Sequence, residues 1–127
     1  MSLSLRNKTL IATVTGLIVT LSLIFMGLSE NNKPAVTVGM TNQLNFDPDT
    51  VRISTGETVR WENSSMLVHS VTADPDEETK DESVSLPDGA ESFNSGLMDP
   101  DETFEYTFTV PGTYNYFCIP HEAMMTG

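Results

Sequence analysis

Side chains that bind soft metals lie close together near the end of the chain. Two residues separate Cys118 from His121, and Met124 and Met125 follow His121 within four positions. A thiolate and a thioether favour copper, and a Cys, two His and a weak axial Met form a trigonal copper site. The spacing therefore predicts most of the ligands of a mononuclear copper centre in one short loop.

The chain contains two histidines, so only one is left to complete such a site. That residue is His69, within Val68-His69-Ser70-Val71-Thr72, where apolar and polar residues alternate. Alternation with period two predicts a strand or the edge of a strand. An isolated histidine in a strand is usually a packed or surface residue, and His69 becomes a candidate ligand only because the other donors exist.

Local structure explains how two residues can separate the Cys and His ligands. Cys118 ends an aromatic and β-branched run over residues 113–118 that follows a Pro111-Gly112 turn signal, so we expect it at the end of a strand. Pro120 disfavours helix at the residue before it and narrows the conformations of the loop. We therefore expect His121 to face back towards Cys118.

The single cysteine also favours metal binding. One Cys in an exported domain has no intramolecular disulfide partner, and its thiol is open to oxidation unless it is buried or bound to metal. The alternative interpretation is a small buried core residue. A second Cys to bridge two copper ions is absent, which argues against a binuclear centre.

The elements that must position these residues are short strands. Several short strands with Gly and Pro turns between them favour an all-β sandwich of one domain over residues 30–127. Alternation in Phe104, Tyr106 and Phe108 indicates one aromatic core face, and Trp61 is interpreted as a core residue. The predicted strands are 35–40, 50–54, 57–63, 68–73, 103–110 and 113–118.

The amino terminus predicts export. Arg6 and Lys8 precede an uncharged apolar stretch over residues 10–28, which is near the length of about 20 residues that spans a bilayer. We expect residues 1–29 to be an N-terminal hydrophobic helix that acts as a signal peptide or a membrane anchor. The positive charges before it place the rest of the chain outside the cytoplasm, in the periplasm or on the outer surface.

The C-terminal PGTYNYFC-x-x-H motif with a following Met, together with VHSVT and VRW upstream, resembles the small blue copper proteins of the plastocyanin, pseudoazurin, amicyanin and halocyanin type. The resemblance implies a cupredoxin-like Greek-key β-sandwich and an electron-carrier role. It implies His69, Cys118 and His121 as equatorial ligands of one type 1 copper ion. It also implies that Ser70 ties the ligand loops together.

Two details follow from the same resemblance. Met125-Thr126-Gly127 reproduces a Met-x-Gly pattern, so Met125 is the expected axial ligand and Met124 the alternative. The family usually continues with a short strand, which this sequence does not contain. Either the sequence is truncated or, if Gly127 is the true end, we expect the domain to lack its last strand, with an unpaired edge and a loosely held methionine beside the ligand loop.

The charge excludes one class of partner and suggests another. The chain carries a formal charge of −12, and without Arg6 and Lys8 it carries −14, so nucleic acid is excluded because a phosphate backbone needs a basic surface. The acidity either steers a redox protein with a basic docking patch or maintains solubility. The acidic segment 74–101 is interpreted as a solvated loop and not as a calcium site.

The function expected is single-electron transfer between extracytoplasmic redox proteins by a monomeric Cu(II)/Cu(I) carrier, without catalysis. The resemblance implies that electrons pass through the second histidine, His121, and that an apolar collar of Pro120, Ala123 and Met124, with Leu44 and Phe46, forms the docking patch around it. Alternatives are a copper chaperone or storage protein, and a β-sandwich surface module without metal.

Overall fold

The computed structural model describes residues 33–77 and 84–127. The predicted N-terminal helix lies outside these residues, as does part of the acidic loop. Within them the chain is mostly β, as the sequence predicts, with two 3-10 turns, η1 (Pro75–Glu77) and η2 (Ile119–His121). No helix of the described part is long and apolar enough to cross a membrane.

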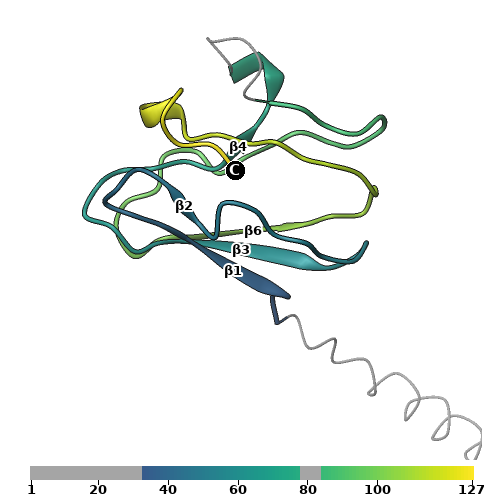
Figure 1. Ribbon diagram of the computed structural model, residues 1–127, viewed down its shortest axis with the longest axis horizontal. Helices are drawn as coiled ribbons and strands as arrows, with labels where there is room; N and C mark the ends of the chain where they lie inside the picture. The colour runs from purple at the N-terminus through teal and green to yellow at the C-terminus, as the bar shows by residue number, and fades with distance from the viewer. Residues whose placement is uncertain (1–32, 78–83) are drawn as a thin grey trace, which may run out of the picture. The chain divides into compact units, whose positions relative to one another are not determined.

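A four-stranded sheet forms one layer, in the order β2-β1-β3-β6 (Figure 1). β1 runs parallel to β3, and β6 pairs antiparallel with the other edge of β3. The predicted strands 35–40 and 57–63 are therefore confirmed, and 103–110 is confirmed up to Thr107. The bounds are β1 (Val36–Met40), β2 (Phe46–Asp47), β3 (Thr58–Asn63) and β6 (Thr103–Thr107).

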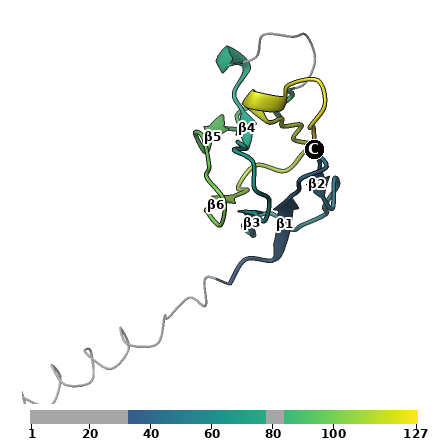
Figure 2. The same cartoon turned by 90° about the vertical axis from the view of Figure 1, so that its left-hand side faces the viewer.

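The second layer consists of a two-stranded sheet and the C-terminal segment that contains Cys118 and His121. β4 (Thr72–Ala73) pairs antiparallel with β5 (Phe93–Asn94). Figure 2 shows this pair and the C-terminal segment stacked over the four-stranded sheet. Phe117 joins the C-terminal segment to β4, because its amide and its carbonyl each bond to Thr72 at 2.9 Å.

The core between the layers is built around one aromatic side chain. Trp61 is fully buried, and its ring centroid lies 5.4 to 6.3 Å from those of Phe93, Phe104, Phe108 and Tyr116. Phe104 and Phe108 lie on the face that the alternation predicts, whereas Phe93 reaches Trp61 from β5 and Tyr116 reaches it from the C-terminal segment. Together these rings exclude water from the core. The interpretation of Trp61 as a core residue is confirmed.

The predicted strand 68–73 forms over Thr72–Ala73 only. At the two residues directly before Thr72, backbone amides donate to side-chain acceptors and not to the carbonyls of a neighbouring strand. The amide of Ser70 donates to Cys118 Sγ at 3.3 Å, and the amide of Val71 donates to Ser95 Oγ at 2.8 Å. His69 forms a single bridge with Met98. A segment whose amides are used in this way holds side chains in place but cannot continue a sheet.

The predicted strands 50–54 and 113–118 do not form as continuous strands. Both segments line a groove of about 480 Å³ that also reaches Trp61. The backbone of Val51, Arg52 and Ile53 makes no hydrogen bond within the described residues, and segment 113–118 pairs at single positions with Ser85, Thr72 and Thr126. Segment 50–54 therefore has no neighbouring strand within the described residues. Residues 115–118 do have neighbours, but successive amides bond to different segments, at Ser85, Gly127, Thr72 and Met125, so no continuous ladder forms.

Candidate metal centre

Two backbone hydrogen bonds to Met98 hold His69 in position. Its amide donates to the Met98 carbonyl at 3.1 Å, and its carbonyl accepts from the Met98 amide at 2.8 Å. The residue is fully buried, as is Ser70 beside it. A pair of short backbone bonds on a buried segment holds the imidazole at one place in the core.

Cys118 and His121 are held by a paired segment and a tight turn. Residues 116–118 pair with 125–127, with Cys118 N donating to Met125 O at 3.1 Å. Cys118 has extended backbone and directly precedes η2, whose Pro120 lies in the first turn. His121 N donates to Cys118 O at 3.1 Å, which folds the loop back. The return of His121 towards Cys118 is as expected, but the expected strand ending at Cys118 does not form, and the loop returns through the 3-10 turn η2, which includes Ile119 although Pro120 was expected to disfavour helix there.

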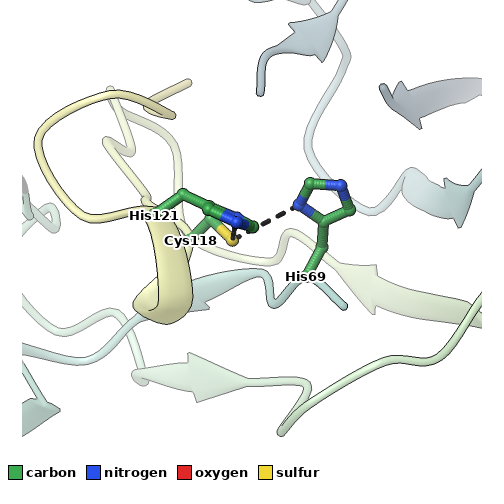
Figure 3. Close-up of side chains that lie close together, drawn as sticks. All are labelled: His69, Cys118 and His121. Carbon is green, nitrogen blue, oxygen red and sulfur yellow. Dashed lines mark hydrogen bonds between the residues drawn. The ribbon is translucent and has the colours of Figure 1, made fainter. Parts of the chain in front are cut away.

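The three side chains meet at one point (Figure 3). Cys118 Sγ lies 3.6 Å from His69 Nδ1 and 3.4 Å from His121 Nδ1, and all three candidate ligand atoms lie within 4.8 Å of one another. A sulfur about 2.3 Å and a nitrogen about 2.0 Å from one ion are roughly 3.5 to 3.8 Å apart at tetrahedral to trigonal angles. The described residues therefore fit a metal ion between them.

The electrostatics of the site favour neutral imidazole and oppose a free thiolate. Burial raises the pKa of the Cys118 thiol, and hydrogen bonds from the Ser70 and His121 amides counteract that rise. Burial, followed by the charge of His121, lowers the pKa of His69, while a backbone hydrogen bond with Thr41 raises it. A buried thiol of raised pKa gains most from a bound cation, which stabilises the thiolate.

Ser70 connects the two ligand loops, as the resemblance implies. Its amide donates to Cys118 Sγ, and its hydroxyl accepts from the Ile119 amide at 2.8 Å. The same hydroxyl lies 3.1 Å from Thr72 Oγ1. One residue next to His69 thus holds the sulfur of Cys118 and the backbone that follows it.

The two candidate methionines differ sharply in burial. Met125 is fully buried, whereas 65% of Met124 is exposed. Met125 N donates to His121 O at 3.1 Å, so both of its backbone groups are bonded to residues of the ligand loop. This differs from the loosely held methionine expected from the sequence, because the pairing of 125–127 with 116–118 already secures it.

Sequence reasoning missed two buried polar residues behind His69. Ser65 Oγ lies 2.9 Å from His69 Nε2, and Asn63 Oδ1 lies 2.8 Å from Ser65 Oγ. The one sequence feature that could have suggested this contact is the hydroxyl of Ser65, four residues before His69. Only the turn after β3 brings that hydroxyl onto the ring.

The set of exposed apolar side chains differs from the collar that the sequence predicts around His121. Pro120, Ala123 and Met124 are exposed as predicted, but Phe46 is buried in the core and does not belong to the surface. Further exposed residues lie directly before His69 and directly before its backbone partner Met98. We call the exposed large apolar set the apolar rim: Met66, Leu67, Val68, Leu97 and Met124.

The acidic segment 74–101, for which the sequence argued against a calcium site, is described in part. Asp74 Oδ1 accepts from the Asp76 amide, and Glu77 ends the short turn η1. The remaining acidic residues of that cluster lie outside the described residues. Within the described residues, His69, Cys118 and His121 form the group of His, Cys, Asp or Glu side chains close enough to hold a metal.

Comparison with known proteins agrees with this geometry. Residues 34–127 match the family of copper binding proteins described as the plastocyanin/azurin family. Plastocyanin from Scenedesmus fuscus is 37% identical over 81 residues, covering 61% of this chain and 74% of that protein. The chain spans about half the length of the chloroplastic plastocyanins that it matches.

Solved structures show the same likeness. A pseudoazurin from Sinorhizobium meliltoi is similar with a TM-score of 0.57 and 26% identity, covering 72% of this chain and 68% of that one. A copper-containing nitrite reductase from Thermus scotoductus SA-01 is similar with a TM-score of 0.58 and 28% identity, covering 75% of this chain but 21% of the enzyme.

Proposed function

Because the chain belongs to the plastocyanin/azurin family of copper-binding proteins, we propose that it carries single electrons between redox proteins through one type 1 copper ion. The observation that carries the proposal is the buried thiol of Cys118 with two imidazole nitrogens 3.4 and 3.6 Å from its sulfur. When bound, copper supplies a reversible one-electron couple, and this donor set is the one that blue-copper sites use.

We assign a separate role to each side chain of the site. The Cys118 thiolate would hold the ion and supply the strongest electronic coupling, and His69 and His121 would be its two imidazole ligands. Met125 would be the weak fourth ligand, a choice supported by its full burial and by the 65% exposure of Met124. Ser70 donates its amide to the sulfur and thereby stabilises thiolate charge.

The rigidity of the site favours an electron carrier over a chaperone or storage protein. His69 and Cys118 are fully buried, and each is fixed by backbone hydrogen bonds. A chaperone must release its metal, whereas a carrier must keep its ligands in nearly the same place in both oxidation states. The likeness to nitrite reductase covers 21% of that enzyme, so it extends to a domain and brings no catalytic role to this chain.

The proposed contact with partners is at the apolar rim. His69 is fully buried while His121 is half-buried, so His121 is the ligand nearer to solvent. Exposed apolar residues beside it exclude water from a close encounter. The formal charge of −12 then favours a basic redox partner, whose encounter rate falls as salt screens the attraction.

The fold and the cellular location are proposed on the same basis. The two layers of the described residues and the likeness to pseudoazurin support a Greek-key β-sandwich. The apolar stretch over residues 10–28 supports export of residues 30–127 to an extracytoplasmic space, by a signal peptide or a retained anchor.

The first experiment adds one equivalent of Cu(II) to the full chain and records visible and electron paramagnetic resonance spectra before and after ascorbate. We expect an intense visible band with narrow copper hyperfine splitting that ascorbate bleaches reversibly. Cys118→Ser removes the thiolate and should abolish that band. A weak band with ordinary type 2 parameters in the wild-type protein would contradict the proposal and favour metal transport.

A further inference from the structure

A buried polar cluster lies on the side of His69 that faces away from Cys118. Asn63 ends β3 and is fully buried. Its Nδ2 donates to the carbonyls of Leu67 at 2.8 Å and of Met98 at 3.0 Å. Since a carbonyl can only accept, both bonds require the NH₂ group at that position, and the amide cannot be flipped. The acceptor Oδ1 must therefore face Ser65.

The orientation of Asn63 determines the orientation of the Ser65 hydroxyl. Ser65 Oγ lies 2.8 Å from Asn63 Oδ1, which has no proton to give. The hydroxyl has two possible acceptors, Oδ1 at 2.8 Å and the Leu67 carbonyl at 3.2 Å. Its proton points at the nearer Oδ1, because two facing lone pairs at 2.8 Å would repel each other, and with either acceptor the proton is not available to His69. Ser65 Oγ also accepts from the Leu67 amide at 3.0 Å. A hydroxyl has one proton and two lone pairs, so one lone pair remains.

That remaining lone pair faces His69 Nε2 at 2.9 Å. An acceptor at this distance requires a proton on Nε2. A neutral imidazole carries one proton, so Nδ1 is then a bare lone pair. His69 Nδ1 is the nitrogen that lies 3.6 Å from Cys118 Sγ. The hydrogen bonds of two main-chain carbonyls thus determine which imidazole nitrogen is free.

We propose that Asn63 and Ser65 are positioning residues that hold the proton of His69 on Nε2 and so present Nδ1 unprotonated to the metal. The inference rests on the proposed function in one respect, namely that His69 is a ligand. The tautomer itself is a property of the metal-free chain. Neither residue belongs to the group of candidate metal ligands, and both are buried, with Ser65 3% exposed.

Loss of the Ser65 hydroxyl should have two separate effects. Ser65→Ala removes the hydroxyl acceptor and leaves the Thr41 backbone as the remaining hydrogen-bond partner of the His69 ring. Exchange of the Nε2–H with solvent should therefore accelerate by about tenfold, as expected for the net loss of one hydrogen bond. The ring is also freed to rotate or to change tautomer, and the outer partners of a ligating His typically contribute about 10- to 100-fold to metal affinity. We expect a loss of metal affinity at the lower end of that range.

The test uses ¹⁵N–¹H NMR of the reduced, metal-free full chain at about pH 8, above the ordinary histidine pKa of about 6.5. The expected wild-type signal is a slowly exchanging Nε2–H on His69. Ser65→Thr keeps a hydroxyl and should keep the signal. Ser64→Ala is the matched control, because that exposed neighbour bonds to Met40 O at 3.2 Å and does not bond to His69.

Affinity for Zn(II), which is diamagnetic, is then measured for the same variants. A wild-type His69 protonated on Nδ1 would overturn the inference, as would unchanged exchange and unchanged Zn(II) affinity in Ser65→Ala. Failure of the proposed function would look different. In that case the Nε2–H signal would be present as described, but copper would give no blue-copper spectrum.

Discussion

Ser70→Ala tests whether one buried hydroxyl holds the two ligand loops together. Ser70 is fully buried, and its hydroxyl accepts from the Ile119 amide at 2.8 Å. The substitution leaves that amide without its acceptor. Thr72 Oγ1 also loses a contact but keeps Asn94 Oδ1 at 3.2 Å. The Ser70 amide, which donates to Cys118 Sγ, is unchanged.

The expected loss of stability depends on the hydrogen bonds that the substitution removes. A part-buried donor that loses its acceptor costs about 1 to 3 kcal/mol, and the loss of one oxygen atom adds little cavity. In a domain of this size, each kcal/mol lowers the melting temperature by about 4 to 8 °C. We therefore expect Ser70→Ala to lower the free energy of unfolding by about 1 to 3 kcal/mol.

The assay is urea unfolding of the copper-free, reduced full chain, followed by the fluorescence of Trp61, which is its one tryptophan. Ser92→Ala is the control, because Ser92 is exposed and its change should stay within about 0.5 kcal/mol. A loss below about 0.5 kcal/mol in Ser70→Ala would refute the reasoning. It would mean that solvent satisfies the Ile119 amide and that Ser70 does not tie the loops.

Three further predictions concern the ligand loop and pH. Met125→Leu should keep the intense visible band and shift the redox potential, whereas Met124→Leu should shift nothing because its side chain is exposed; the reverse pattern in voltammetry would make Met124 the axial ligand. Ala123 has φ of 73°, so Ala123→Gly should relieve about 1 to 2 kcal/mol of backbone strain. After the entropy cost of Gly, we expect the free energy of unfolding measured in urea to rise by up to about 1 kcal/mol. A lower free energy of unfolding would argue against strain at this residue. Because the pKa of His69 is lowered in the folded state, the unfolded chain binds that proton at higher pH, so the stability of the copper-free protein should fall as pH falls below about 6.5. In His69→Phe this part of the pH dependence should vanish, and equal slopes in the two proteins would contradict it.

The sequence alone was sufficient for the three residues that meet at the centre. Two histidines and one cysteine leave no other combination, and a Cys and a His separated by two residues are brought together by a local turn. The alternation around Trp61 likewise predicts its burial, because period two has one physical meaning in a strand. These features depend on residue type and on local geometry, and both can be read along the chain.

The tertiary structure decided what depends on distant neighbours. Segment 50–54 has the composition of a strand but no adjacent backbone, so its pattern could not reveal that it stays unpaired. Burial separates Met125 from Met124, although the two are adjacent in sequence. Asn63 and Ser65 reach His69 only because β3 and the bridge to Met98 converge there. Sequence therefore determined which donors are present, while the packing of remote segments determined how each donor is held and protonated.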